Sequence, residues 1–466
     1  MNIIIKVIEM ISLFILFYFF VVSITYVILI FFSAGRLKRF VNVMNNDITV
    51  ESNYIKPISI IVPAYNEQQT IIDNLESLLN LNYPIYEIVL VNDGSDDDTL
   101  KKVIEHFHLR KIDMDFNDQL PCNEIIGTYG SFERNNFIVL DKVNGGKSDA
   151  LNAGINASKY PLYCAIDADC VIEKNALMRI VKPFLKSKET IAVGGIVRIA
   201  NGCTIKGGKL LNAKLPKKII VTFQILEYFR AFLSSRIGWE SMNSLLIISG
   251  AFGVFKKAAV IEVGGYHKTI GEDMELTLRL HEYFRKNKRK YKIDFTSDAV
   301  CWTQAPDTLR GIQSQRLRWH RGLVDSLLKH KRMLLNPRYG TVGLVSMPYF
   351  VFVEMLGPVV ETIGYIILLI SAILGIVSSN FLMVFLLAYL YGMLFSLAAI
   401  LLEQFSFKRY SNVAEITKLI GLSFMEQFSY RQFTVFFRVQ AFFNFRKGSK
   451  TWGTIKRKKF SDDSEH

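Results

Sequence analysis

Residues 58–67 read ISIIVPAYNE, a short apolar run that passes directly into polar side chains. A run of this length that is rich in Ile and Val is typical of a strand buried on both faces, as in a parallel sheet. Similar runs recur at residues 87–91, 137–140, 162–166 and 191–197. Segments with helical periodicity separate them, near residues 67–79, 97–107, 148–157 and 174–185. The alternation predicts an α/β domain, a parallel sheet covered by helices, over residues 57–335.

Chemically active side chains and a proline stand at the ends of three of these runs: Pro63, Tyr65, Glu67, Asp93, Asp167 and Asp169. In open α/β sheets, ligands bind beyond the carboxyl ends of the strands. Carboxylates gathered at one edge need a counter-charge, and a divalent cation that bridges a diphosphate supplies it. The set therefore predicts a site for a nucleoside diphosphate and a metal ion, although an Asp-x-Asp pair taken alone is most often a loop pair or a helix cap.

Gly145, Gly146 and Lys147 stand directly before a predicted helix. Backbone N–H groups at a helix N-terminus and a neighbouring lysine favour phosphate oxygens. The alternative is an ordinary glycine turn with a solvated lysine. The segment is not a Walker loop, because the G-x-x-x-x-G-K-[ST] spacing is not met.

Two further motifs lie downstream. Gln315, Arg318 and Trp319 are spaced so that an amide, a guanidinium and an indole share one face of a helix. Arg318 suits a pyrophosphate and Trp319 offers a platform for a sugar ring; a solvated basic helix anchored by a buried Trp is the alternative. Glu272 and Asp273 precede another helix, where an acidic pair commonly caps the N-terminus. Beside a bound sugar nucleotide, the same pair could supply the base for an inverting transfer.

The composition indicates a membrane protein. Of the 466 residues, 50% are hydrophobic and 13% aromatic, which is too apolar for an ordinary soluble enzyme of this size and excludes a disordered chain. The five cysteines show no C-x-x-C pair, so neither a zinc site nor a disulfide framework is indicated. The net charge of +14 concentrates beside the apolar stretches and no nucleic-acid-binding motif accompanies it, so we expect no nucleic-acid partner.

The uncharged stretches predict three membrane spans. Residues 10–34 carry no charge and give a transmembrane helix within residues 1–35, followed by a basic linker over residues 36–56. Residues 336–446 hold the remaining helices, with spans near 359–378 and 381–402. The positive-inside rule then places residues 57–335 and the basic tail, 447–466, in the cytoplasm, with the chain in the cell membrane.

Two segments near these spans resist a simple assignment. Residues 342–358 are apolar but broken by prolines, and we expect an interfacial segment that leads into the next span. Residues 412–445 mix charges with Phe and Leu, which favours one or two amphipathic helices in the interface; a re-entrant hairpin is the alternative.

With its motifs in this order, the chain resembles the processive, membrane-embedded members of the inverting family 2 glycosyltransferases. The resemblance implies a GT-A (Rossmann-like) domain inserted between transmembrane and interfacial helices. It also implies that Tyr65 and Asp93 contact uracil, and that Lys147 and Asp167 contact diphosphate and ribose. Asp169 is implied to bind Mg²⁺ or Mn²⁺.

For the transfer step, the resemblance implies that Asp273, preceded by Glu272, is the general base. Gln315, Arg318 and Trp319 are implied to bind the diphosphate and the acceptor sugar. The enzyme is then a hexosyltransferase that moves a sugar from a UDP-sugar to a growing polysaccharide.

Within this family the chain looks most like the bacterial poly-β-1,6-N-acetylglucosamine synthases, which implies a β-linked, translocated biofilm exopolysaccharide and a small membrane partner subunit. A single N-terminal span, an inserted polar segment over residues 108–134 and Gln304 in place of Glu depart from that pattern. A cellulose- or hyaluronan-type synthase, and a non-processive transferase to a lipid or short acceptor, are the alternatives. A lapsed binding subunit is disfavoured, because the full set of carboxylates and Arg318 is retained.

Overall fold

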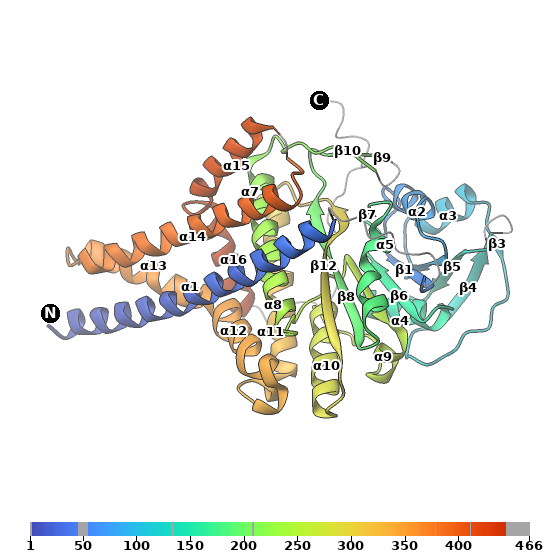
Figure 1. Cartoon of the computed structure of the whole chain (residues 1–466), viewed down its shortest axis with the longest axis horizontal. Coiled ribbons are helices and arrows are strands. Elements are labelled where there is room, and N and C mark those ends of the chain that lie inside the picture. The colour runs from blue at the N-terminus through green and yellow to red at the C-terminus, as the bar shows by residue number, and fades with distance from the viewer. Residues whose placement is uncertain are drawn as a thin grey trace.

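The computed structural model describes residues 2–44, 55–131, 135–206, 209–377, 379–410 and 412–443. The predicted tail, 447–466, and residues 45–54 of the predicted linker lie outside these ranges. The chain forms an α/β domain, from which a group of long apolar helices extends to one side (Figure 1).

A ten-stranded sheet forms the centre of the α/β domain, in the order β3-β4-β5-β2-β1-β6-β11-β8-β12-β7. Its strands are β1 (Ile58–Ala64), β2 (Tyr86–Asn92), β3 (Arg110–Lys111), β4 (Ile125–Gly130), β5 (Phe137–Lys142), β6 (Leu162–Ile166), β7 (Cys170–Ile172), β8 (Thr190–Ile199), β11 (Phe252–Lys256) and β12 (Lys292–Thr303). A separate hairpin pairs β9 (Thr204–Lys206) with β10 (Lys209–Asn212).

The five predicted strands are present as β1, β2, β5, β6 and β8, but the prediction of a parallel sheet was wrong: the sheet is mixed. Strands β5, β2, β1 and β6 run parallel to one another and β12 runs parallel to β8, whereas β4, β11 and β7 pair antiparallel with their neighbours. Strand β4 comes from the inserted polar segment, where it covers the edge of β5 and stays partly exposed. The parallel strands are fully buried because helices cover both of their faces.

Side chains of β1 alternate between two cores. Ile60 and Val62 pack with the face that carries α2 (Ile71–Leu79) and α7 (Ile219–Phe229), while Ile61 faces the core that includes α4 (Lys147–Ala157). Shorter helices complete the two layers: α3 (Thr99–His106), α5 (Ala176–Ile180), α6 (Lys182–Lys186), α8 (Ile237–Ser241) and α9 (Lys257–Glu262). Because successive side chains of a strand point to opposite faces, this alternation fixes the register of the sheet.

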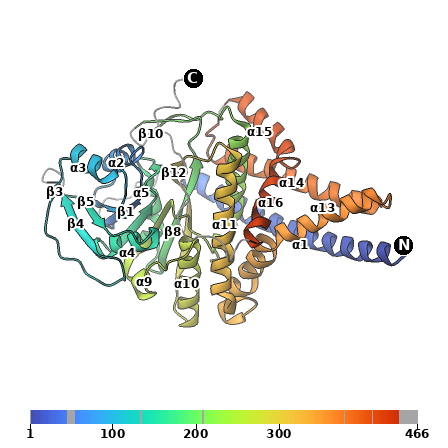
Figure 2. The same cartoon turned by 180° about the vertical axis from the view of Figure 1, so that it is seen from behind.

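Two longer helices stand at the end of the sheet that adjoins the apolar group (Figure 2). These are α10 (Glu272–Lys286) and α11 (Leu309–Lys329), which contact each other along their length. A π-helix, Arg230–Arg236, joins α7 to α8 beside them. Helices α10 and α11 carry the acidic pair and the Gln-x-x-Arg-Trp motif, respectively.

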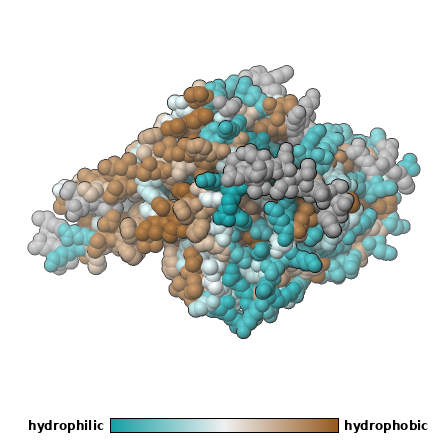
Figure 3. Space-filling view, in the orientation of Figure 1, coloured by the Kyte–Doolittle hydropathy of each residue, from teal (hydrophilic) through white to brown (hydrophobic). Residues whose placement is uncertain are grey.

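The apolar group consists of α1 (Asn2–Met44), α13 (Gly357–Ile373), α14 (Ser379–Ser406), α15 (Val413–Glu426) and α16 (Tyr430–Phe443). Among the described residues, three helices are long and apolar enough to cross a membrane: Lys6–Arg39, Val342–Ile373 and Phe385–Ser406. They give the projecting part of the molecule an apolar surface, in contrast to the polar surface of the sheet domain (Figure 3). The protein is therefore a membrane protein.

The structure refines the predicted boundaries in this region. Residues 342–358 do not form a separate segment: π-helical turns and α12 (Met347–Tyr349) continue into α13, so this segment belongs to a candidate span. Residues 413–443 form two amphipathic helices, α15 and α16, of 14 residues each. Helix α1 continues to Met44, so the first part of the predicted linker is helical.

Ion pairs fasten the apolar helices to the sheet domain. Arg198 of β8 and Glu403 of α14 form a buried, two-pronged pair with N–O distances of 2.9 and 2.8 Å. Arg36 of α1 pairs with Glu240 of α8. Arg230 pairs with Glu426 of α15 at 2.5 Å. Buried pairs of this kind fix orientation, because breaking one leaves an uncompensated charge.

Candidate active site

A cavity of about 1090 Å³ lies between the carboxyl ends of the central strands, α10 and α11. All but two of the residues predicted for the site line it: Pro63, Glu67, Lys147, Asp167, Asp169, Glu272, Asp273, Gln315, Arg318 and Trp319. The two exceptions are Tyr65 and Asp93. Segments far apart in the sequence thus meet in one space, as expected where strand ends converge.

Lys147 joins two carboxylates across the cavity. Its Nζ lies 2.6 Å from Asp167 Oδ1 and 3.1 Å from Glu272 Oε1, and its side chain is only 10% exposed. Burial acts to lower the pKa of Lys147, but the charges of Asp167 and Glu272 outweigh it and raise that pKa. The ammonium therefore stays charged, and it is placed where a phosphate could exchange with a carboxylate.

Gly250 allows this approach. A Cβ at Gly250 would lie 2.8 Å from Lys147 Nζ, so a larger residue would push the ammonium away from its partners.

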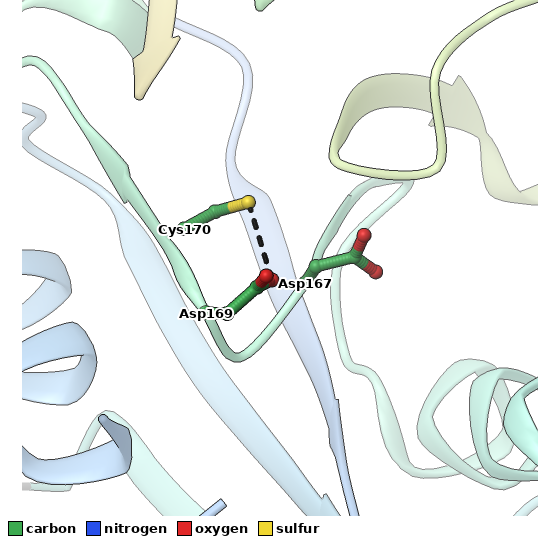
Figure 4. Close-up of side chains that lie close together, drawn as sticks. All are labelled: Asp167, Asp169 and Cys170. Atoms are coloured by element: carbon green, nitrogen blue, oxygen red, sulfur yellow. Dashed lines mark hydrogen bonds between the residues drawn. The ribbon is translucent and has the colours of Figure 1, made fainter. Parts of the chain in front are cut away.

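Asp167 and Asp169 form the candidate metal centre. Their carboxylates and the Cys170 sulfur lie within 4.8 Å of one another. Asp169 turns its carboxylate toward the Cys170 sulfur, which donates to Oδ1 at 3.5 Å (Figure 4). Two adjacent carboxylates at the rim of a cavity fit Mg²⁺ or Mn²⁺, because these ions prefer oxygen ligands and take the rest from water or phosphate.

Glu272 and Asp273 open α10. Asp273 Oδ1 accepts a hydrogen bond from the Met274 N–H at 2.8 Å, and Oδ2 accepts one from the Gly250 N–H at 3.2 Å. The N-cap of α10 is Gly271 and neither acidic residue caps the helix, so the capping alternative was wrong; the Asp273 carboxylate lines the cavity instead. Burial raises the pKa of Glu272 against the opposing charge of Lys147.

The Gln-x-x-Arg-Trp motif lies on α11. Gln315 is 9% exposed, and its Oε1 is buried without a hydrogen-bond partner among the described residues. Trp319 is 42% exposed, and the guanidinium of Arg316 lies over its ring at 4.4 Å from the centroid. Arg316 in turn donates to Glu227 Oε2 at 2.6 Å. This bond fixes the guanidinium that packs against one face of the indole. An open indole and an unsatisfied amide suit a sugar ligand.

Asp93 lies behind the glycine turn and not on the cavity wall. It is 3% exposed, and its carboxylate accepts hydrogen bonds from Lys142 Nζ at 2.7 Å, Gly145 N–H at 3.0 Å and Gly146 N–H at 2.7 Å. Gly146 adopts a φ of +91°, which favours glycine. Asp93 thus shapes the turn that presents Lys147. Its contact with uracil stays a prediction.

Tyr65 follows β1 on the same side of the sheet. Its hydroxyl donates to Asp96 Oδ2 at 3.1 Å, and the next residue, Asn66, has a φ of +57°. The role of Tyr65 in base binding stays a prediction as well.

The sequence analysis missed several charged residues of the cavity, among them Arg236, Glu354 and Arg438. Arg236 lies 3.9 Å above the Phe232 ring, and burial lowers its pKa to about 10. Glu354 and Arg438 line the end of the cavity toward the apolar helices and pair at 3.3 Å. A signal existed for the last two, because charges within apolar segments are costly and mark functional sites.

The fold and this constellation define a class, the GT-A glycosyltransferases. The structure is similar to the mannosyltransferase PcManGT from Pyrobaculum calidifontis, solved in complex with GDP-Man and Mn²⁺, with a TM-score of 0.54 and 17% identity over 91% of this chain and 99% of that one. Residues 59–264 match the model of glycosyl transferase family 2, and residues 164–403 match that of glycosyl transferase family group 2. The chain belongs to family 2 of the glycosyltransferases.

Its sequence relatives are more specific. The chain is 31% identical over 280 residues to the poly-β-1,6-N-acetyl-D-glucosamine synthase of Staphylococcus epidermidis. This match covers 60% of this chain and 57% of that protein. It is 30% identical over 319 residues to the synthase of the same name from Staphylococcus aureus strain COL, covering 68% and 66%. The matches thus span less than two thirds of either synthase.

Proposed function

We propose that this protein is a membrane-embedded polysaccharide synthase that transfers N-acetylglucosamine from UDP-N-acetylglucosamine to a growing chain with inversion, forming a β-linked exopolysaccharide. The observation that carries the proposal is the single cavity that joins Asp167 and Asp169 to Asp273 and Trp319, and that ends among the apolar helices at Glu354. The names of the staphylococcal relatives support the choice of sugar.

The donor occupies the strand-end side of the cavity. Lys147 and Arg318 bind diphosphate oxygens and Tyr65 contacts the base, while Asp93 supports the base site from beneath the glycine turn, where Lys142 and the turn amides bind its carboxylate. Asp167 and Asp169 would hold Mg²⁺ or Mn²⁺, which would neutralise charge on the leaving diphosphate. In the described residues no carboxylate pairs with Arg318, so its guanidinium can take a phosphate without breaking an ion pair.

The transfer is a single displacement. A hydroxyl oxygen of the acceptor attacks the anomeric carbon, a new C–O bond forms, and the bond from that carbon to the phosphate oxygen breaks so that UDP leaves. Asp273 accepts the hydroxyl proton, while Lys147 and Arg318 stabilise the charge on the diphosphate. Because one displacement inverts the anomeric carbon, an α-linked donor gives a β-linked product. Trp319 holds the acceptor ring during the attack.

The polymer leaves along a row of polar side chains. From Glu354 and Arg438 at the cavity, the next pair is Glu361 of α13 with Arg431 of α16, at 2.7 Å. On the partner side, Arg431 and Arg438 are seven positions apart on α16, about 10 Å along the helix axis. A sugar chain can cross hydrocarbon only where protein or water satisfies its hydroxyls. The row supports translocation from a cytoplasmic catalytic domain through the cell membrane, with a small membrane subunit as an additional partner.

The test is a donor survey. The purified full-length chain in liposomes receives Mn²⁺ or Mg²⁺ and each radiolabelled UDP-sugar in turn, and the products are sized. We expect a ladder of long products from UDP-N-acetylglucosamine alone. The ladder is lost in Asp273→Asn and kept in the matched control Asp325→Asn, whose carboxylate pairs with Lys329. A single-sugar adduct would instead establish a non-processive transferase, and a ladder from UDP-glucose a cellulose-type synthase.

A further inference from the structure

Helix α10 carries the proposed base and α11 carries the acceptor platform, so their separation sets the geometry of the transfer. The two helices meet at a pair of glycines. A Cβ on Gly271 would lie 2.9 Å from Gly322 Cα, and a Cβ on Gly322 would lie 3.0 Å from Gly271 Cα. Neither glycine has a positive φ, so the closeness of the two backbones, and not their conformation, requires glycine.

The contact adjoins both functional groups. Gly271 directly precedes Glu272 and Asp273, and Gly322 follows Trp319 by three residues, about one helical turn. Ser326, one turn further along α11, donates its hydroxyl to the Gly271 carbonyl oxygen at 3.3 Å. The start of α10 therefore packs closely against α11 and is hydrogen-bonded to it.

A second contact between α10 and α11 lies at the C-terminal end of α11. His330 is 5% exposed and stands between two carboxylates of α10, with Nδ1 at 2.5 Å from Glu282 Oε2 and Nε2 at 3.3 Å from Glu275 Oε1. Both nitrogens can donate only when the imidazole is protonated.

We propose that Gly322 and His330 are positioning residues: the glycine contact and the imidazole between two carboxylates hold α10 and α11 so that Asp273 meets the hydroxyl of a sugar stacked on Trp319. The inference rests on the proposed function, since it needs an acceptor at Trp319 and a base at Asp273. Neither residue touches the reacting atoms. The two contacts join α10 to the C-terminal half of α11 at separate points, which constrains both the distance and the angle between base and platform.

The contact of His330 with the two carboxylates depends on pH. Burial acts to lower the pKa of His330, but its hydrogen bonds to Glu275 and Glu282 raise that pKa above the ordinary value. The stabilisation is therefore complete below the ordinary histidine pKa and is lost as the pH rises through the raised one. The other charged groups around this cluster act on the two carboxylates or flank them: Arg279, His267, Lys286, Lys329 and Arg332.

The first experiment compares Gly322→Ala with the control Gly421→Ala in full-length enzyme. Gly421 lies in α15, and a Cβ there meets nothing within 4 Å. Because misplacement by about 1 Å costs on the order of 100-fold, we expect kcat for sugar transfer to fall at least about tenfold in Gly322→Ala. UDP affinity should fall much less than kcat, because Arg318 is the only proposed UDP ligand on α11, while Lys147, Asp167 and Asp169 lie on other elements.

Loss of UDP affinity and transfer in parallel, or unchanged transfer, would overturn the assignment of Gly322. If wild-type enzyme neither binds UDP nor transfers sugar, the proposed function fails instead, so the two failures are distinguishable.

The second experiment records the pH profile of kcat for His330→Asn and for the control His267→Asn, whose imidazole is 54% exposed beside the same Glu275. We expect wild type and His267→Asn to lose activity on the alkaline side as His330 deprotonates. His330→Asn should have a low kcat at neutral pH, and its pH profile should lack the alkaline limb, that is, the fall in kcat on the alkaline side. An unchanged limb in His330→Asn would refute the role of His330.

Discussion

The pair formed by Arg198 and Glu403 gives a sharp prediction about how the catalytic domain is attached to the membrane helices. Arg198 is 4% exposed and Glu403 is fully buried, and their two N–O distances are 2.9 and 2.8 Å. The centroid of the Phe407 ring lies 5.1 Å from the guanidinium, and Arg198 Nε is buried with no hydrogen-bond partner in the part of the chain that the structure describes. Because both side chains are buried, bulk water has little access to the charge that would be left on Arg198 if the carboxylate were removed.

Glu403→Gln keeps the shape of the side chain but removes the compensating charge. Removing one partner of a buried pair costs about 3–5 kcal/mol, whereas replacing both by apolar residues is often neutral or stabilising. We expect Glu403→Gln to lower the unfolding temperature by about 5 °C or more. The double variant Arg198→Met with Glu403→Leu should recover most of that loss.

The assay is thermal unfolding in detergent, followed by tryptophan fluorescence. The control is Glu262→Gln, which breaks the exposed pair with Arg289 and should cost no more than about 1 kcal/mol. Equal effects of Glu403→Gln and Glu262→Gln, or a double variant less stable than Glu403→Gln, would refute the view that the burial of Arg198 makes its pairing obligatory.

Three further predictions concern the site. Lys147→Met should weaken UDP binding by roughly tenfold or more in calorimetry, because a charge-assisted hydrogen bond contributes about 1.5–3 kcal/mol; an affinity within twofold of wild type would contradict the placement of the ammonium. Asp169→Asn should raise the Mn²⁺ concentration for half-maximal rate by at least about tenfold, and an unshifted metal titration would exclude Asp169 as a ligand. Burial raises the pKa of Glu272, so wild-type stability should fall as the pH rises through that raised pKa, and Glu272→Gln should remove this slope in melting curves taken across the carboxyl range.

The parts of the fold that could be predicted from the sequence are those in which local pattern and burial agree. Strands β1 and β6 are buried on both faces, so their apolar runs are continuous and easily seen. Strand β7 has three residues and follows Asp169 directly, and β11 is antiparallel to both of its neighbours, β6 and β8. Their direction depends on how distant segments pair, which periodicity does not record.

In the site, too, local patterns were predictable and contacts between distant segments were not. The motif residues were predictable because strand ends converge at one edge and because Gln315, Arg318 and Trp319 share a helix face. The contact of Asp93 with uracil stays a prediction, but its place beneath the glycine turn, where Lys142 and the turn amides bind its carboxylate, was not foreseen. That arrangement requires β2 and β5 to lie side by side. Such pairing is a feature of the tertiary structure that the local sequence pattern does not record.

The most direct measurement is synthesis into sealed liposomes. Full-length enzyme is reconstituted, radiolabelled UDP-N-acetylglucosamine and Mn²⁺ are added outside only, and an external glycosidase then removes any polymer outside the vesicles. We expect polymer that resists the glycosidase until detergent opens the liposomes, and none from Asp273→Asn. Polymer that is fully digested without detergent would contradict translocation through the apolar helices, and the absence of any polymer while UDP still binds would contradict polysaccharide synthesis by this chain without the proposed membrane subunit.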